Sequence, residues 1–186
     1  LKDSTETHRA LIWLGQNPIL AVLAGTILTM LLQSSSASIM MVQILAFQGA
    51  FGSDWDLVLR IVIPFIFGDN IGTTITAQLA SLQMSRNAKR VSMGHTIFNF
   101  VGVLYMLPFV KLGWYATAVE WITPVKLTQG TIMVHIAVSH TLFNVFNSIV
   151  FLPIIGVLET MVMKILPFKE EELAQKPVAL EKHLLD

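Results

Sequence analysis

A polar cluster inside an uncharged stretch constrains this chain more than any other feature. Residues 10–53 contain no Asp, Glu, Lys, Arg or His, and QSSSAS stands at positions 33–38 in the middle of them. Apolar runs lie on both sides, ILAVLAGTILTMLL before the cluster and IMMVQILAF after it. In lipid, an unpaired polar group costs several kcal/mol. These side chains must therefore face protein, water or a ligand.

The composition places the chain among integral membrane proteins. Hydrophobic residues make up 54% of the chain and charged residues 13%, with a mean hydropathy of +0.67. The 12 basic and 12 acidic side chains cancel, so nothing indicates a nucleic-acid partner. The absence of cysteine excludes disulfide frameworks and thiolate metal sites. The chain begins at Leu1 without Met, and we expect it to be a fragment of a longer protein.

The cluster separates two short helices. Asn17 and Pro18 mark the first start, because Asn caps helices and Pro fits the first helical position. At about 1.5 Å per residue, residues 19–32 would extend roughly 21 Å, against a hydrocarbon core of about 30 Å. The second run, residues 39–51, is equally short. A re-entrant hairpin and a broken spanning helix both remain possible. We favour a hairpin over residues 17–52, after an exposed lead-in over residues 1–16.

A second polar break, GDNIGTT at 68–74, interrupts the next apolar stretch. Residues 57–82 are long enough to cross a bilayer, so the sequence predicts a discontinuous transmembrane helix over residues 57–84. Asp69 lies between Phe67 and Ile71, and an intramembrane carboxylate is a functional candidate by default. The alternative is a residue at the edge of the lumen.

The remaining chain predicts two spanning helices and a charged tail. Residues 85–90 hold three basic side chains and no acid, so the positive-inside rule places them in the cytoplasm. Helices are expected at 91–110 and 131–155. Between them, residues 111–126 form an interfacial connection, with Trp114, Tyr115 and Trp121 at the lipid head groups. An amphipathic segment at 158–168 and a cytoplasmic tail at 169–186 follow, in a multi-pass protein of the plasma membrane or bacterial inner membrane.

One motif occurs twice, as GHTIFN at 94–99 and SHTLFN at 139–144. Each copy has a proline 13 residues after its histidine, so we expect two similar helices in equivalent positions around one centre. His95 and His140 are interpreted as hydrogen-bonded packing residues rather than proton carriers or ligands. Asn99 and Asn144 are interpreted as hydrogen-bonding contacts between helices.

Broken helices can bind ions. One half-helix exposes N–H groups that attract anions, and the other exposes C=O groups that attract cations. Transporters use such breaks near the midplane for substrate and coupling ion together. Here residues 35–37 and 72–74 would present donors to one tetrahedral anion. The oxygens suited to a hard cation such as Na⁺ belong to Gln33, Asp69 and Asn70. The alternative is close helix packing, which serine and glycine also permit.

At these breaks the sequence resembles the type II sodium–phosphate cotransporter family, most of all its bacterial branch. The resemblance covers residues 17–167 and is carried by QSSSAS at 33–38, GDNIGTT at 68–74, HTIFNF at 95–100 and HTLFNV at 140–145. It implies an all-α integral membrane fold that forms one half, the second QSSS copy, of an inverted-repeat transporter. It also implies sodium-coupled symport of inorganic phosphate by alternating access, no enzymatic activity and no organic cofactor.

The resemblance and the chemistry of the residues together give a set of expected site residues. The residues expected to bind phosphate are Ser34, Ser35, Ser36, Thr73 and Thr74. Those expected to bind sodium are Gln33, Ser34, Asp69, Asn70 and Thr73. Supporting positions are Gly68, Gly72, His95, Asn99, His140 and Asn144. Family members usually carry a small residue where this chain has Asp69, so its carboxylate would add a cation ligand, change the charge moved per cycle, or repel phosphate.

The family has two QSSS copies that face each other, and this chain has one. A second copy is therefore expected, from another part of the full-length protein or from an antiparallel second chain. The tail resembles a segment that leads into a cytoplasmic helical domain. Two alternatives are a phosphate-sensing membrane scaffold that does not transport, and an intramembrane hydrolase using a serine of 34–36 with His95 or His140. The hydrolase lacks a Gly-rich nucleophile elbow and a paired acid.

Overall fold

The computed structural model describes residues 5–168, which form helices and, within that range, no strand. Three stretches, residues 55–81, 86–111 and 129–165, are long and apolar enough to cross a membrane. The prediction of an all-α integral membrane protein is confirmed. In chain order the helices are α1 Thr5–Gln16, α2 Pro18–Leu32, α3 Ser35–Phe47, α4 Trp55–Ser81, α5 Arg86–Lys111, α6 Trp114–Ile122, the 3₁₀ helix η1 Gln129–Thr131, α7 Ile132–Phe151, the 3₁₀ helix η2 Leu152–Ile154 and α8 Ile155–Ile165.

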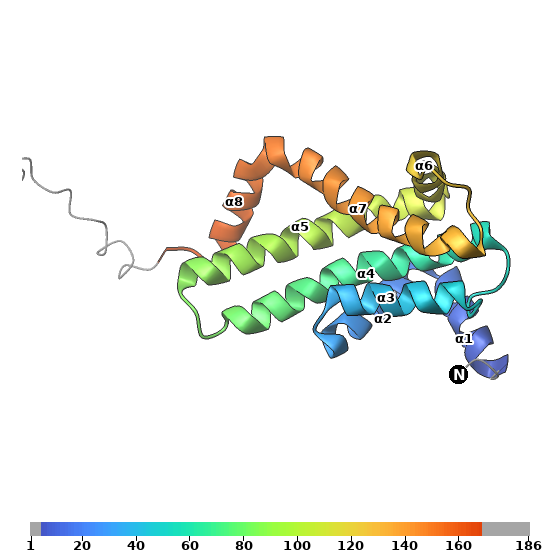
Figure 1. Cartoon of the computed structure of the whole chain (residues 1–186). Coiled ribbons are helices and arrows are strands. Elements are labelled where there is room, and N and C mark those ends of the chain that lie inside the picture. Colours follow the sequence, from blue (N-terminus) through green and yellow to red (C-terminus); the bar gives the residue numbers. More distant parts are fainter. Residues whose placement is uncertain (1–4, 169–186) are drawn as a thin grey trace, which may run out of the picture.

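Helices α2 and α3 form a helical hairpin. Asn17 caps α2, because its side-chain oxygen accepts hydrogen bonds from two backbone N–H groups of the first turn. The helix ends at Gln33, whose left-handed backbone (φ 52°) reverses the chain. Ser34 then caps α3. Figure 1 shows α3 running back beside α2 from this turn. The local caps thus produce two helices of 15 and 13 residues rather than one long helix.

Helix α4 is continuous for 27 residues, so the predicted break at 68–74 is wrong. The polar side chains that suggested it form hydrogen bonds within the helix. The Asn70 side-chain amide donates to the carbonyl of Ile66 at 2.9 Å, and the Thr73 hydroxyl donates to the carbonyl of Asp69 at 2.8 Å. Thr74 likewise donates to Ile71 at 2.8 Å. Bonds of this kind need no unwound backbone.

The glycines of this segment permit close helix packing instead of a turn. A Cβ on Gly68 would lie 2.0 Å from the carbonyl oxygen of Val22, and one on Gly72 would lie 2.7 Å from that of Thr26. On the other side of the same contact, a Cβ on Gly25 of α2 would lie 2.1 Å from the backbone oxygen of Phe65 in α4. Contact this close between two backbones requires residues without side chains. Helix α2 therefore packs directly on the backbone of α4.

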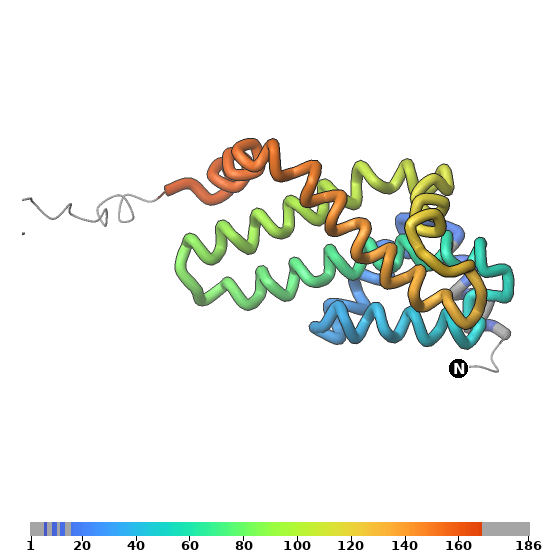
Figure 2. The backbone as a smooth tube through the Cα atoms, turned by 45° about the horizontal axis from the view of Figure 1, so that its top comes forward, coloured from blue at the N-terminus to red at the C-terminus, as the bar shows by residue number. Residues whose placement is uncertain are grey.

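Helix α4 is the centre of the fold. It contacts α1, α2, α3, α5, α6 and α7, and all ten residues from 61 to 70 are buried. Phe67 packs against Tyr115 of α6 and Phe143 of α7, with ring centroids 5.1 and 4.5 Å away. Figure 2 shows α4 running between the α2–α3 hairpin and α5. Helix α4, which carries the polar GDNIGTT motif, is thus the most buried helix of the described chain.

Two predictions about the connections are corrected by the structure. The basic residues expected in a loop at 85–90 lie in the first turns of α5, which Ser85 caps. The connection expected at 111–126 contains α6. Trp114 and Trp121 are exposed, but Tyr115 is buried and donates its hydroxyl to the carbonyl of Ser139 at 2.6 Å. Tyr115 therefore belongs to the core, and its assignment to an interfacial belt is wrong.

The ends of the chain differ from expectation in smaller ways. The lead-in predicted at 1–16 contains helix α1. The helix predicted at 131–155 has its last α-helical residue at Phe151, because Pro153 lies in η2, and Figure 1 shows the chain bending there into α8. Helix α8 occupies most of the expected amphipathic segment at 158–168. The tail predicted at 169–186 lies outside the described residues.

Candidate functional site

A buried carboxylate joins both arms of the hairpin to α4. Asp69 has no exposed surface. Its Oδ1 accepts a hydrogen bond of 2.7 Å from the Thr29 hydroxyl on α2 and one of 2.6 Å from the Ser38 hydroxyl on α3. These lengths lie within the usual range for hydroxyl groups that donate to an oxygen. We call this set of Asp69, Thr29 and Ser38 the Asp69 junction.

The other oxygen of Asp69 has no partner. Oδ2 is buried and forms no hydrogen bond with any described residue. A buried charged oxygen without a partner raises the free energy of the fold, so a cation placed beside it would be stabilising. The hydroxyls of Thr29 and Ser38 keep lone pairs after donating their protons to Oδ1. With Asp69 ionised, the junction therefore offers oxygen acceptors to a small cation.

The sequence prediction omitted Thr29 and gave Ser38 no role. A signal for Thr29 was present, because Gly25 and Thr29 are four residues apart and so share a face of α2. Small residues at this spacing mark a face that packs closely on another membrane helix. Ser38 lies inside QSSSAS, but its contact with Asp69 joins residues 31 positions apart. A single sequence carries no signal for that pairing.

The tip of the hairpin presents the QSSS motif at the surface. Gln33, Ser34 and Ser36 are exposed, and Ser35 is half-buried. The Ser34 hydroxyl accepts the N–H of Ala37 at 3.3 Å and so caps α3. The prediction that a helix opens at these serines is confirmed. The first N–H groups of a helix have no partner within it and carry partial positive charge, so the tip has the chemistry of an anion site.

Thr73 and Thr74 are not brought to this tip as hydrogen-bond donors. Their hydroxyls donate to backbone carbonyls of α4, and Thr74 is fully buried. A hydroxyl has one proton and two lone pairs. In this conformation, both side chains can therefore serve a cation as oxygen ligands but cannot donate to phosphate.

The two HTxFN copies are not equivalent. The Asn144 side-chain amide donates to the carbonyl of His140 at 2.9 Å and to Oδ1 of Asn70 at 3.2 Å, and so links α7 to α4. The Asn99 amide donates to the carbonyl of His95, on its own helix, at 3.0 Å. Both copies lie on helices that contact α4, but the first copy bonds that helix through Thr96, which accepts from Gln78, and the second bonds it through Asn144.

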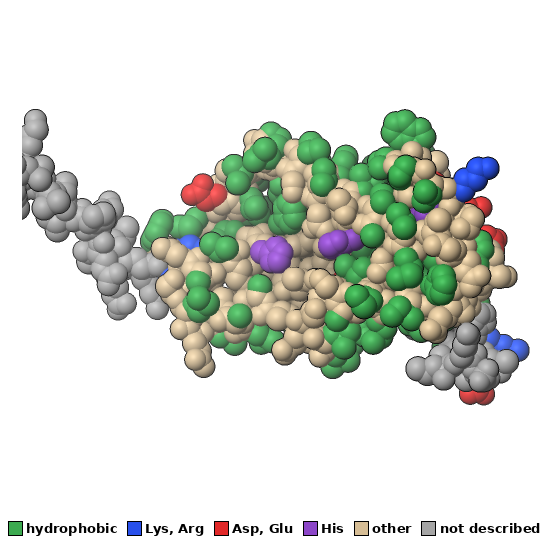
Figure 3. Space-filling model, in the orientation of Figure 1, with side chains coloured by type: hydrophobic (Ala, Val, Ile, Leu, Met, Phe, Trp, Pro, Cys, Tyr) green, Lys and Arg blue, Asp and Glu red, His purple; other side chains and the backbone are tan. Residues whose placement is uncertain are grey.

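The histidines of the motif form no hydrogen bond with the serines of the tip in the described part of the chain. His95 is exposed and His140 is partly buried. Figure 3 shows histidine side chains reaching the surface over the middle of the molecule. Within residues 5–168, no hydrogen bond joins a serine of 34–36 to either histidine. The geometry thus provides no serine–histidine pair for hydrolysis.

Comparison with known proteins agrees with these features. The family model for the Na+/Pi-cotransporter matches residues 3–165. The uncharacterized protein YqeW of Bacillus subtilis is 31% identical over 150 residues, which cover 80% of this chain and 44% of that protein. The human sodium-dependent phosphate transport protein 2C is 35% identical over 139 residues, which cover 67% of this chain and 22% of that protein. For human protein 2B, the identity is 36% over 98 residues, with 50% and 13% covered.

The chain thus spans less than half the length of these relatives. No solved structure matches it. The family match extends from α1 to the end of α8 and includes both the QSSS tip and the Asp69 junction. The chain belongs to the Na+/Pi-cotransporter family.

Proposed function

We propose that this chain supplies one half of the binding site of a sodium-coupled phosphate symporter that works by alternating access. The observation that carries the proposal is the arrangement of two ion-binding features on one hairpin. An anion-binding tip lies at the start of α3, and the Asp69 junction lies one helical turn further along, at Ser38. The human relatives are named as sodium-dependent phosphate transport proteins, which agrees with this pairing.

Phosphate is assigned to the tip. The hydroxyls of Ser34, Ser35 and Ser36 and the first N–H groups of α3 are donors, and the positive end of the helix dipole favours a multiply charged anion. Thr73 and Thr74, which the resemblance also assigns to phosphate, would first have to exchange their intrahelical hydrogen bonds. Thr73 and Thr74 would therefore contribute to phosphate binding only in a different conformation of the transport cycle.

Sodium is assigned to the Asp69 junction. Asp69 Oδ2 would supply the negative charge, and the other residues expected to bind sodium, Gln33, Ser34, Asn70 and Thr73, would supply neutral oxygens. Because Asp69 also holds both arms of the hairpin, a cation at Oδ2 would change the strength of the contacts that hold α2 and α3 on α4. A ligand shifts a conformational equilibrium only through different affinity for the two states. The Asp69 junction would provide such a difference in sodium affinity, because the hydrogen bonds from Thr29 and Ser38 to Asp69 form only while α2 and α3 lie against α4.

The remaining residues of the expected site hold together the helices that carry the two ion-binding features. Gly68 and Gly72 allow α2 to lie on α4, and Asn144 fixes the side chain of Asn70. His95, His140 and Asn99 are proposed to act in packing, without direct contact to either ion.

The exposed tip favours a second QSSS copy opposite it. Three exposed or half-exposed serines and an exposed glutamine are incompatible with lipid and would form only one side of a dehydrated phosphate site. The second copy would come from another part of the full-length protein or from an antiparallel second chain. By the positive-inside rule, the basic side chains at the start of α5 support the proposal that this end of the molecule and the C-terminus face the cytoplasm, in an inner or plasma membrane.

Transport assays test the proposal. The complete protein, with both halves of the site, is reconstituted in proteoliposomes, and uptake of labelled phosphate is measured with an inward sodium gradient or an equal potassium gradient. We expect uptake with sodium and background levels with potassium. Equal uptake in both would contradict the coupling. Phosphate binding without uptake would instead support the alternative of a phosphate-sensing scaffold.

A further inference from the structure

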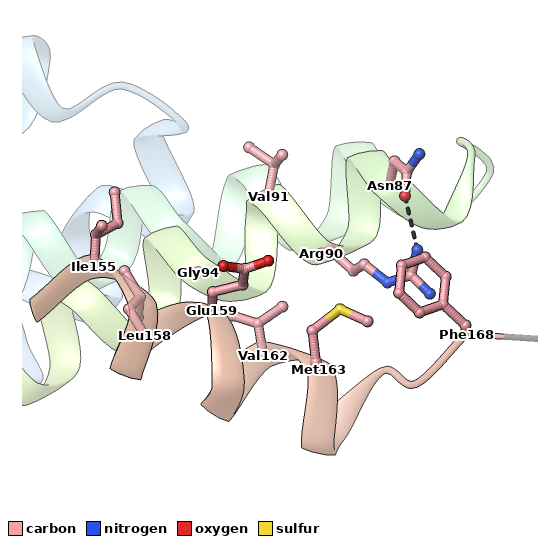
Figure 4. A pocket seen from close by; sticks show the side chains of 10 residues that line it. All are labelled: Asn87, Arg90, Val91, Gly94, Ile155, Leu158, Glu159, Val162, Met163 and Phe168. Carbon is pink, nitrogen blue, oxygen red and sulfur yellow. Dashed lines mark hydrogen bonds between the residues drawn. The ribbon is translucent and has the colours of Figure 1, made fainter.

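A pocket between α5 and α8 shares no residue with the hairpin or the Asp69 junction. Its volume is about 490 Å³. Figure 4 shows its walls, with Val91 and Gly94 on α5 and Leu158, Val162 and Met163 on α8. These side chains are apolar, so the pocket is suited to hydrocarbon rather than to a charged solute.

Arg90 closes one end of this pocket. Its guanidinium donates to the carbonyls of Leu166 and Pro167, both at 3.0 Å, and to Oδ1 of Asn87 at 2.7 Å. It also lies 4.3 Å from the centre of the Phe168 ring. Figure 4 shows Asn87, Arg90 and Phe168 together at this end. The guanidinium holds the last carbonyls after α8, which lack helical partners, so the shape of the pocket is fixed by directed bonds.

Basic charge is concentrated at the same end. Arg86, Lys89 and Arg90 lie in the first turns of α5, and Lys164 lies in the last turn of α8. Among the described residues that line the pocket, the one acidic side chain is Glu159, whose carboxylate points toward Gly94 in Figure 4, away from the Asn87–Arg90 end. An apolar pocket with a basic rim therefore lies between two stretches that are long and apolar enough to cross a membrane.

We propose that this pocket binds an acyl chain of an anionic phospholipid, whose phosphate lies at the basic rim near Lys89. Basic pockets between membrane helices on the cytoplasmic side bind acidic head groups. The apolar walls match the acyl chain, and Lys89 and Lys164 supply positive charge for the head group. Arg86 and Arg90 already donate hydrogen bonds to the carbonyls after α8. Glu159 disfavours an anionic head group beside Gly94, so the head group lies at the rim and only hydrocarbon enters. The lipid then reinforces the contact that Arg90 makes between α5 and the end of α8.

Thermal unfolding of the purified protein in detergent tests this site. Dioleoyl phosphatidylglycerol or dioleoyl phosphatidylcholine is titrated in, and unfolding is followed by tryptophan fluorescence. A ligand that binds only the folded state raises Tm in proportion to its occupancy. We expect phosphatidylglycerol to raise Tm by several degrees and phosphatidylcholine to raise it much less.

Two variants locate the effect. Lys89→Gln should weaken the phosphatidylglycerol affinity about fivefold, the equivalent of about 1 kcal/mol for one basic side chain at a membrane surface. The matched control Lys111→Gln removes the same charge from the opposite end of α5 and should leave the affinity unchanged. Gly94→Leu should remove most of the response, because a Cβ there meets only Val162 within 4 Å, at 3.6 Å, and a larger side chain extends into the pocket.

Three results would overturn the proposal. One is equal stabilisation by both lipids. Another is an unchanged phosphatidylglycerol response in both Lys89→Gln and Gly94→Leu. The third is a change of oligomeric state in Gly94→Leu without any lipid dependence, which would make the pocket a contact between copies of this chain. Because each variant is also melted without lipid, a folding defect is seen directly. Glu159→Gln gives an independent check, since loss of that charge should strengthen phosphatidylglycerol binding.

Discussion

One carboxylate oxygen of Asp69 connects three helices, so single-atom changes there should affect stability. Ser38→Ala removes a hydrogen bond to a buried charged group, which contributes about 1.5–3 kcal/mol. We expect a loss of that size in unfolding experiments in detergent. Ser148→Ala is the matched control, because the exposed Ser148 hydroxyl bonds only to the carbonyl of Asn144 in its own helix. Its effect should stay within about 0.5 kcal/mol. Equal losses would show that the junction contributes nothing specific.

The unpaired oxygen of Asp69 gives a second prediction at this scale. Asp69→Asn keeps one oxygen that can accept from Thr29 and Ser38 but replaces Oδ2 by an N–H₂ group. We expect the sodium concentration for half-maximal phosphate uptake to rise about tenfold or more, the equivalent of about 1.4 kcal/mol. Asp54→Asn makes the same chemical change at the exposed cap of α4, where Asn caps equally well, and should leave the sodium dependence unaltered. An unchanged sodium requirement in Asp69→Asn would remove Asp69 from the sodium site.

At the scale of the helices, the packing of α2 on α4 depends on glycine. A Cβ on Gly68 would come within 2.0 Å of the Val22 carbonyl oxygen and 2.7 Å of the Thr26 nitrogen, and backbone atoms cannot rotate away. Gly68→Ala should therefore force the helices apart and destabilise the protein by about 1–3 kcal/mol, measured by thermal unfolding. Gly156→Ala, in α8 where no atom lies within 4 Å of such a Cβ, should be neutral or stabilising by up to about 1 kcal/mol. A tolerated Gly68→Ala would disprove the close contact.

The same contact explains which elements could be predicted from the sequence. The hairpin could be, because its signals are local: Asn17 with Pro18, two short apolar runs, and serines that cap α3. The continuity of α4 could not be predicted from the sequence. Glycines and hydroxyls inside an apolar run fit an unwound segment and a close helix contact equally well, and the choice depends on Thr26 and Thr29 of α2, about 40 residues away. For the same reason, the sequence identified Asp69 as a candidate but not the two hydroxyls that bind it.

At the scale of the whole molecule, the proposal requires the tip to face water and a second half-site. This chain has no cysteine, so a single introduced cysteine is the only thiol within residues 1–186, and any cysteine elsewhere in the complete protein is first replaced by serine. In the reconstituted complete protein, Ser36→Cys should react with a membrane-impermeant thiol reagent, because Ser36 is exposed. Sodium and phosphate together should slow that reaction at least several-fold, since the substrate would cover the tip. Ser38→Cys should not react, because this position is fully buried against Asp69.

Ser53→Cys controls for general effects of the ions, because Ser53 is exposed in the connection between α3 and α4. Its labelling should be independent of sodium and phosphate. Protection of Ser36→Cys by phosphate alone would separate the tip from the Asp69 junction, since coupling predicts that sodium must bind for phosphate to stay. If Ser36→Cys reacted with the thiol reagent from neither side of the membrane, the tip would be buried in protein or lipid in every conformation. The opposing half-site would then be refuted even if the symporter assignment held, because substrate reaches that site only through water.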